Sequence, residues 1–170
     1  MAGPATIPTC TDTLAAVAVS SDLPTVARLV DGEVAVLVTR RNGREALLLH
    51  RAPEGGAYWH VVAGAIEPGE TPVAAAAREL LEETGLEAAV SGGVAVVEYV
   101  HVPTLQPADE RDRSEEDVVA LPVTCFVTAA PDEWEPSLDG EHDAHRWCTP
   151  ADALAMLRWP GTAKGLRALL

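Results

Sequence analysis

Acidic side chains recur at fixed spacing between residues 64 and 86, in the stretch GAIEPGETPVAAAARELLEETGL. Glu79, Glu82 and Glu83 stand three and four residues apart, so on a helix they crowd together and repel one another. Carboxylate oxygens are the ligands that Mg²⁺ takes in proteins, together with substrate phosphates. The spacing therefore favours a site for a divalent cation and a phosphorylated ligand. The alternative is a solvated acidic helix face, which is what most Glu-rich helices present.

The same stretch carries the start and stop signals of a helix over residues 72–84. Thr71 suits the N-cap, Pro72 suits the first helical position, and Gly85 suits the residue past the last turn. At about 100° per residue, the three acids share one face of this helix. The opposite face is expected to pack on the protein core through Val73, Ala77, Leu80 and Leu81.

A glycine, an isolated glutamate and an arginine accompany the three acids at fixed intervals, which a solvated helix face does not explain. The pattern resembles the signature box of the Nudix hydrolases: Gly, five residues, Glu, seven residues, Arg-Glu-aliphatic, one residue, Glu-Glu, one residue, Gly-aliphatic. Nine positions match it: Gly64, Glu70, Arg78, Glu79, Leu80, Glu82, Glu83, Gly85 and Leu86. Agreement at so many constrained positions is far more specific than a short motif.

The resemblance implies a role for each polar residue of the box. The ligands of Mg²⁺ or Mn²⁺ would be the carboxylates of Glu79, Glu82 and Glu83 and the backbone carbonyl of Gly64. Glu70 and Arg78 would form a pair that fixes the loop on the helix and completes the catalytic set. Water would attack a phosphorus of a nucleoside diphosphate derivative, and a carboxylate of the box or of the acidic loop 103–117 would accept its proton.

Further residues outside the box are candidates for the same site. Resemblance makes Glu141 a further metal ligand, while His142 and His145 are expected to be structural or exposed, because Mg²⁺ prefers oxygen. The substrate-binding candidates are Arg51, as a phosphate contact, and Tyr58 or Trp59, as a surface for a base or ring. A surface salt bridge for Arg51 and a core position for Trp59 are equally good alternatives.

Apolar runs on both sides of the box predict a mixed β-sheet. Asn42-Gly43 joins two β-branched runs as a hairpin, and the strand expected over 118–128 contains Pro122, which argues for a bulge or an edge position. With a helix expected over residues 151–158 and a further short helix over residues 162–170, the fold class is α/β: a Nudix α/β/α sandwich with the box loop and helix at the sheet edge. Residues 1–22 form an N-terminal arm, and residues 23–170 form a single Nudix domain.

Composition limits the class of partner. The 170 residues carry 26 acidic and 12 basic side chains, a net charge of −14, which disfavours binding to a nucleic-acid polymer. No run is long and apolar enough to span a membrane, and no signal peptide is evident, so a cytoplasmic location is expected. The three cysteines suit buried or free thiols. A homodimer through the arm or an edge strand is left open.

The predicted function is hydrolysis of a pyrophosphate linkage in a small phosphorylated, nucleotide-like substrate. The Glu-His pair at Glu141 and the Trp-Pro-Gly-Thr run at Trp159 look similar to the branch that converts nucleoside or dihydroneopterin triphosphates to a monophosphate and pyrophosphate. The alternatives are an enzyme for sugar nucleotides, ADP-ribose or dinucleoside polyphosphates, and a sensor that binds nucleotide without cutting it. Sensors commonly lose a box carboxylate, and this chain loses none.

Overall fold

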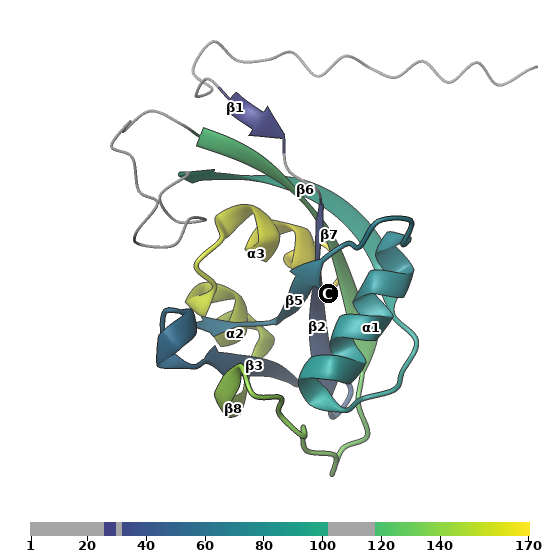
Figure 1. Cartoon of the computed structure of the whole chain (residues 1–170). Helices are drawn as coiled ribbons and strands as arrows, with labels where there is room; N and C mark the ends of the chain where they lie inside the picture. The colour runs from purple at the N-terminus through teal and green to yellow at the C-terminus, as the bar shows by residue number, and fades with distance from the viewer. Residues whose placement is uncertain (1–25, 30–31, 102–117) are drawn as a thin grey trace, which may run out of the picture.

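The computed structural model describes residues 26–29, 32–101 and 118–170 (Figure 1). The strands are β1 (Val26–Leu29), β2 (Glu33–Arg40), β3 (Glu45–Arg51), β4 (Trp59–His60), β5 (Val62–Ala65), β6 (Ser91–His101), β7 (Val118–Ala129) and β8 (His142–Cys148). The helices are η1 (Pro53–Gly55), α1 (Pro72–Thr84), α2 (Pro150–Met156) and α3 (Pro160–Arg167). The predicted arm 1–22 and acidic loop 103–117 lie outside the described residues. Within them, no helix has both the length and the hydropathy needed to cross a membrane.

Strand β2 lies in the middle of a mixed sheet and connects its two halves. It runs parallel to β7 along one edge, and its other edge pairs antiparallel first with β5 and then with β3. Strand β6 pairs antiparallel with the far edge of β7, whereas β4 and β8 both pair antiparallel with β3. The sheet therefore has a mixed half around β7 and an antiparallel half around β3, joined by the β2–β3 hairpin that Asn42-Gly43 predicts.

Pro122 lies inside a strand that has neighbours on both sides, so the expected edge position is wrong. On one side of β7, Pro122 pairs with Val97 of β6 in unbroken register. On the other side, β1 pairs with residues up to Ala120 and β2 begins at Val123. Proline cannot donate a ladder hydrogen bond. It is tolerated here because it falls at the gap between two partner strands.

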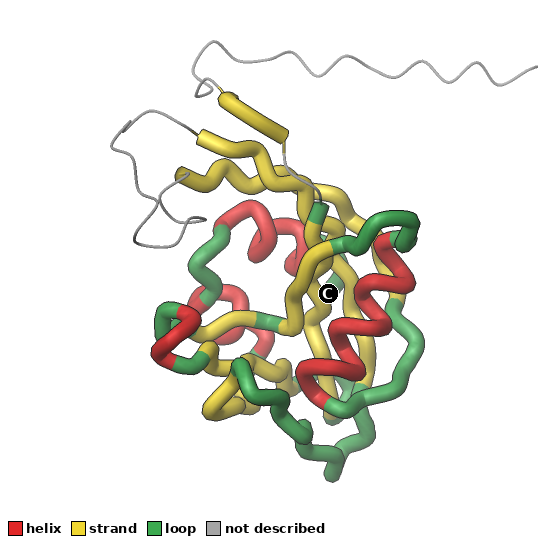
Figure 2. Tube along the Cα trace, viewed as in Figure 1, coloured by secondary structure: helices red, strands yellow, loops and turns green. Residues whose placement is uncertain are grey.

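Three helices cover the two faces of the sheet and give the expected α/β/α sandwich (Figures 1 and 2). Alternate residues of β2 divide between the two cores, because successive side chains of a strand point to opposite faces. Val34, Val36 and Val38 join the core beneath α1, and Ala35 and Leu37 join the core beneath α2 and α3. All five are at most 2% exposed, so β2 is buried on both faces.

Helix α1 uses a different face for the core than the sequence suggests. Val73 is 56% exposed, Leu81 is 50% exposed and Ala77 is also exposed, so the expected burial of these three side chains is wrong and only that of Leu80 is confirmed. The side chains that face inward are Ala75, Ala76, Leu80, Glu83 and Thr84. Glu83 lies on the core side because it follows Leu80 by three residues, which places the two side chains on one face. One acid of the box therefore points toward the sheet.

Candidate active site

The box helix is held in place by its own end signals. The Thr71 hydroxyl accepts a hydrogen bond from the backbone N–H of Ala74 at 3.2 Å, and Pro72 occupies the first turn. Gly85 has a φ of 73°, and its N–H bonds to the carbonyl of Leu81 at 2.8 Å. Left-handed backbone of this kind favours glycine. These local interactions explain why the predicted bounds, 72–84, match the structure.

Strand β5 brings Gly64 against the middle of α1. A Cβ atom added at Gly64 would overlap the carboxylate of Glu79, so no larger residue fits there without moving it. The backbone of β5 and the side chain of Glu79 therefore lie in direct contact. The backbone at Gly64 therefore lies directly against the first box carboxylate.

Arg78 is the hub of the box loop. Its Nε and Nη2 donate to the two carboxylate oxygens of Glu70 at 3.1 and 3.0 Å, and Nη2 also donates to the Ala65 carbonyl at 2.9 Å. Its Nη1 reaches Glu79 at 2.7 Å and Glu82 at 3.3 Å. The hydrogen bonds from Arg78 lower the pKa of Glu70, and those to Glu70 and Glu79 raise the pKa of Arg78. A bidentate arginine-carboxylate pair fixes orientation as well as charge.

Glu83 is the most buried carboxylate of the box, with 4% of its surface exposed. One oxygen accepts a hydrogen bond from the backbone N–H of Ala63 at 3.3 Å, and the other lies 4.0 Å from Nε2 of His142. Burial raises the pKa of Glu83 to about 9, which the Ala63 hydrogen bond only partly opposes. Burial also raises the pKa of Glu79, against the effect of Arg78. The ionised form of Glu83 is thus disfavoured by burial and would be stabilised by a nearby positive charge.

A buried histidine pair that no sequence motif indicates lies next to Glu83. Nε2 of His60 and Nε2 of His142 are 2.8 Å apart, and Nδ1 of His142 is 2.6 Å from a carboxylate oxygen of Asp139. Burial, followed by the proximity of His142, lowers the pKa of His60 to about 4. His142 is structural in the expected sense, because it is buried and hydrogen-bonded. It is also close to the box, which its place in the sequence does not indicate.

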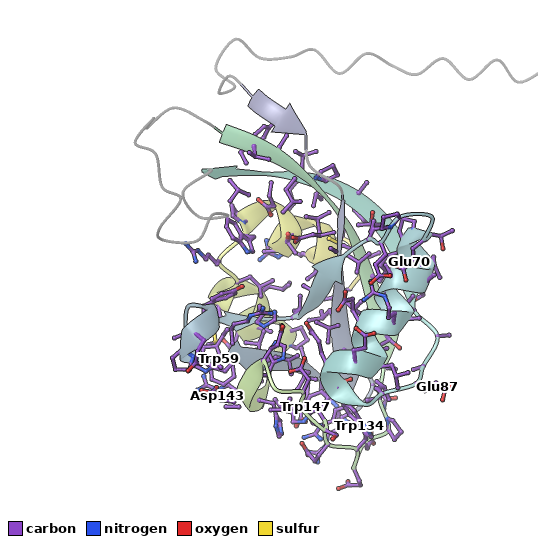
Figure 3. All side chains as sticks on the ribbon, viewed as in Figure 1. Trp59, Glu70, Glu87, Trp134, Asp143 and Trp147 are labelled. Atoms are coloured by element: carbon purple, nitrogen blue, oxygen red, sulfur yellow. The ribbon has the colours of Figure 1, made fainter. Side chains whose placement is uncertain are left out.

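One cavity of about 520 Å³ joins these groups to the other side of the sheet. Ligand sites typically have roughly 300–1,000 Å³. The box residues that line it are Gly64, Glu79, Glu82 and Glu83, and the other predicted site residues that line it are Arg51, Tyr58, Trp59 and Glu141. Glu70 and Arg78 do not line it and instead support its wall. In Figure 3, Glu70 lies beside α1 and Trp59 lies near β8, toward opposite sides of the view.

Arg51 and Trp59 both line the cavity, and each also makes the structural contact that was its alternative: a salt bridge for Arg51 and core packing for Trp59. Arg51 Nη2 lies 2.8 Å from a carboxylate oxygen of Glu141, in a partly exposed ion pair. Glu141 precedes β8 instead of opening it. Trp59 packs against the core beneath α2, and the guanidinium of Arg146 lies 4.7 Å from the centre of its ring. Lining a cavity and packing on the core are thus compatible for this residue.

The chemistry of the donor set fits a hard divalent cation. It consists of carboxylate oxygens and a backbone carbonyl, which are the ligands of Mg²⁺ and Mn²⁺. As the side chains stand, no three His, Cys, Asp or Glu side chains of the described residues converge on one point. Arg78 takes one oxygen of Glu79 and one of Glu82. Binding an ion therefore requires side-chain rotation toward the cavity, where there is room for it.

Comparison with known proteins identifies the class. The model of the NUDIX domain family matches residues 31–169, so the chain belongs to this family. Over 130 residues it is 37% identical to an octanoyltransferase of Myxococcus xanthus. That alignment covers 75% of this chain and 33% of the relative, so the chain spans about a third of the length of the curated protein it matches.

Several solved structures share the fold. E. coli dihydroneopterin triphosphate pyrophosphohydrolase superposes with a TM-score of 0.63 at 22% identity, covering 80% of this chain and 92% of that one. C. elegans Ap4A hydrolase has a TM-score of 0.59 at 19% identity, with 82% and 95% covered. The Nudix domain of Shewanella oneidensis NrtR, solved with ADP-ribose, has a TM-score of 0.56 at 14% identity, with 82% and 85% covered. At these identities the similarity concerns the fold alone.

Proposed function

We propose that this enzyme hydrolyses a nucleoside triphosphate, or a similarly small triphosphate, to a monophosphate and pyrophosphate with the help of Mg²⁺ or Mn²⁺. One observation carries the proposal. A single cavity is lined on the α1 side of the sheet by box carboxylates and on the α3 side by aromatic and apolar side chains such as Trp159 and Leu121. Phosphates beside the carboxylates and one ring at the aromatic end would fill it.

The proposed ligands of the divalent ion are the carboxylates of Glu79, Glu82, Glu83 and Glu141 and the carbonyl of Gly64. When bound, such an ion neutralises phosphate oxygens and lowers the pKa of a coordinated water. Arg78 and Glu70 keep the box loop on α1, so that Gly64 and Glu79 stay in contact. A carboxylate of the box accepts the proton of the attacking water.

Arg51 and the aromatic residues are proposed to bind the substrate. Arg51 is partly exposed and lines the cavity next to Glu141, so its guanidinium can exchange contacts between this carboxylate and a phosphate. Tyr58 lines the same cavity, and the guanidinium of Arg158 lies 5.8 Å from the centre of its ring. Water attacks the α-phosphorus, the bond to the bridging oxygen breaks, and pyrophosphate leaves with that oxygen.

The experiment is a substrate panel with Mg²⁺: nucleoside triphosphates, dihydroneopterin triphosphate, ADP-ribose, a sugar nucleotide and a dinucleoside tetraphosphate. Products are separated by ion exchange, and pyrophosphate is distinguished from orthophosphate. We expect the triphosphates to give monophosphate and pyrophosphate at the highest rate. Orthophosphate as the first product, or preferred cleavage of a two-nucleoside substrate, contradicts the proposal. Tight binding without turnover of any member would support a sensor.

Octanoyl transfer is not proposed for this chain. Only a third of the Myxococcus xanthus protein matches, and acyl transfer by a thiol requires a lowered pKa and access to solvent. Cys125 is buried, and burial raises the pKa of its thiol to about 11. Burial also raises the pKa of Cys148. Neither thiol of the described residues has the properties of a nucleophile.

A further inference from the structure

Glu98 is a buried carboxylate at the wall of the cavity on the α3 side. It lies in β6, lines the cavity, and is only 5% exposed. Its Oε1 accepts a hydrogen bond from the backbone N–H of Thr162, in the first turn of α3. Among the described residues, no hydrogen bond reaches its Oε2. Since a buried carboxylate is costly unless its oxygens find donors, this group has capacity for a further donor.

Gly161 leaves the space that the carboxylate of Glu98 occupies next to α3. A Cβ atom added at Gly161 would lie 2.8 Å from Oε1 of Glu98, which is closer than such atoms approach. The residue at position 161 therefore has to be small for Glu98 to reach the helix. The hydrogen bond to Thr162 holds the carboxylate between β6 and the first turn of α3. An orientation fixed in this way suits recognition, because the acceptor is positioned before a ligand arrives.

The surroundings of Glu98 suit a flat ring. Leu121, Val123 and Trp159 line the same end of the cavity, and they pack on or belong to the apolar core beneath α3. The guanidinium of Arg158 lies 5.2 Å from the centre of the Trp159 ring. Apolar walls with one fixed polar group are the usual make-up of a site that binds a heterocycle and determines its orientation.

We infer that Glu98 selects substrates whose ring carries two adjacent N–H donors, the 2-amino-oxo edge shared by guanine and pterins. A carboxylate only accepts hydrogen bonds, so it pairs with an edge that presents a ring N–H beside an amino group. Adenine presents a ring nitrogen acceptor at the corresponding place and is repelled. Hypoxanthine keeps the ring N–H and lacks the amino group. The inference rests on the proposed function, because it assigns the ring of the triphosphate to this end of the cavity.

The first test uses the wild-type protein and needs no turnover. Calorimetry with GMP, IMP and AMP measures recognition of the ring with the phosphate held constant, and neopterin distinguishes a pterin from a purine source. We expect GMP to bind roughly 10- to 100-fold more tightly than IMP or AMP, since a bidentate pair discriminates by about that factor. Equal binding of the three nucleotides overturns the inference.

The second test uses Glu98→Gln. The amide oxygen of glutamine can still accept from the Thr162 N–H, so the cap of α3 is retained while one acceptor becomes a donor. We expect the preference for GMP over IMP and AMP to disappear, with the same loss in kcat/KM for GTP relative to ATP. Glu87→Gln, the same change at an exposed position outside the cavity, serves as the matched control and should keep the preference.

The two proposals fail in different ways. Hydrolysis of all triphosphates at equal rates, together with equal binding of the three monophosphates, would remove the role of Glu98 and leave the proposed reaction standing. Selective binding of GMP without hydrolysis of any triphosphate would contradict the proposed reaction and leave the role of Glu98 in recognition standing. A Glu98→Gln protein that loses stability but keeps the GMP preference shows that Glu98 only caps α3, which also overturns the inference.

Discussion

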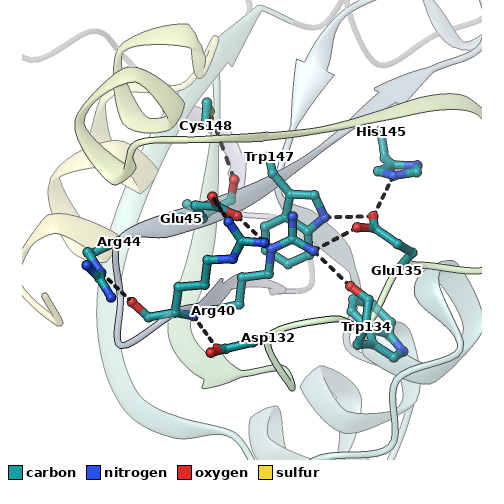
Figure 4. Close-up of polar contacts among 11 residues, drawn as sticks. Arg40, Arg44, Glu45, Asp132, Trp134, Glu135, His145, Trp147 and Cys148 are labelled. Atoms are coloured by element: carbon teal, nitrogen blue, oxygen red, sulfur yellow. Dashed lines mark hydrogen bonds and ion pairs between the residues drawn. The ribbon is translucent and has the colours of Figure 1, made fainter.

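Glu83 and Glu135 have opposite pKa shifts, and their surroundings explain why. Glu135 accepts hydrogen bonds from Arg40 at 2.8 Å and from the indole N–H of Trp147 at 2.9 Å, and Nε2 of His145 lies 3.1 Å away (Figure 4). These contacts, led by that of Arg40, lower its pKa to about 2. Glu83 is buried beside the cavity, and burial raises its pKa to about 9. The ionised form of a glutamate is thus stabilised around Glu135 and destabilised around Glu83.

The region around Arg40 is balanced by the protein itself. Arg40 is 8% exposed, bonds to Glu45 at 2.7 Å and to the Trp134 carbonyl at 3.0 Å, and stacks on Trp147 at 3.9 Å (Figure 4). These contacts tie the end of β2 to β3, to β8 and to the loop that follows β7. A buried cation with paired acids and a stacked ring has no capacity left for a ligand. The region is structural.

The region around the box has more acid than cation. One arginine, Arg78, pairs with Glu70, Glu79 and Glu82 at once, and within the described part of the chain the one basic side chain within 4.0 Å of Glu83 is His142. Carboxylates that the protein leaves unpaired beside a cavity carry a cost that an external cation can remove. The comparison teaches that the balance of charge, more than the number of acids, separates a site from a scaffold.

The largest effect is expected from Glu83→Gln. Turnover should fall by roughly 10²- to 10⁴-fold, the usual contribution of a group that handles the proton in such a reaction. Stability should not fall. Because the folded-state pKa of Glu83 is above its ordinary value, the wild type loses stability as the pH rises toward about 9, and glutamine removes this loss. Pyrophosphate release and melting between pH 5 and 9 measure both, with Glu87→Gln as control. A large drop in melting temperature would instead assign Glu83 a structural role.

Arg40→Gln should lower stability and leave turnover nearly unchanged, which is the opposite of the effect expected for Glu83→Gln. It removes a stacked side chain and leaves Glu45 with only Arg41 and Glu135 with only His145 as basic partners, so we expect a loss of roughly 2–4 kcal/mol in the free energy of unfolding. Turnover well below the melting temperature should stay within about threefold of the wild type, because Arg40 does not line the cavity. Urea denaturation and steady-state rates test the pair of effects, and Arg167→Gln on the surface is the control. Abolished turnover in a folded protein would contradict the separation of the two regions.

Millimolar Mg²⁺ should raise the melting temperature of the wild type, because an ion that binds only the folded state stabilises it. The gain would be about 2.7 kcal/mol at a concentration 100 times the dissociation constant. Arg40→Gln should show an equal shift from its lower starting point, whereas Glu83→Gln should show a smaller one. Differential scanning calorimetry with and without EDTA measures the shifts. Equal shifts in all three proteins would place the ion elsewhere.

The smallest effect is expected at acid pH. The folded-state pKa of Glu135 lies below its ordinary value, so its contribution to stability is present above about pH 4.5 and is lost as the pH falls toward about 2. Glu135→Gln should therefore flatten the dependence of melting temperature on pH in this window. Because Glu135 is half exposed, the change should amount to a few degrees at most. An unchanged acid profile would mean that its hydrogen bonds add no net stability.

Local signals make the box helix and the hairpin predictable, and nonlocal packing makes the rest of the site unpredictable. Thr71, Pro72 and Gly85 determine the ends of α1 by contacts within a few residues. Periodicity shows which residues share a face but not which face the sheet covers, so the prediction misplaces Val73, Ala77 and Leu81. It misplaces Pro122 because the gap between the two partner strands exists only in the folded sheet.

The site residues without a sequence signal come together across long sequence separations. His60 meets His142 from 82 residues away, and Glu98 meets Thr162 from 64 residues away. No spacing rule relates such pairs, and a single histidine or glutamate in a strand has no local signal. The alternation of side chains along β6 could have indicated Glu98 as an inward-facing residue, because it stands between the inward-facing Val96 and Val100.

Binding of Mn²⁺ to the protein alone tests the central claim most directly, with the free ion followed by electron paramagnetic resonance during a titration. The wild type and Glu135→Gln should bind the ion equally. Glu79→Gln and Glu83→Gln should each weaken that binding by at least roughly 10- to 100-fold, as loss of groups that hold or orient a metal does. Equal affinity in all four proteins would show that the box carboxylates do not hold a metal, and would contradict a metal-dependent reaction at this cavity.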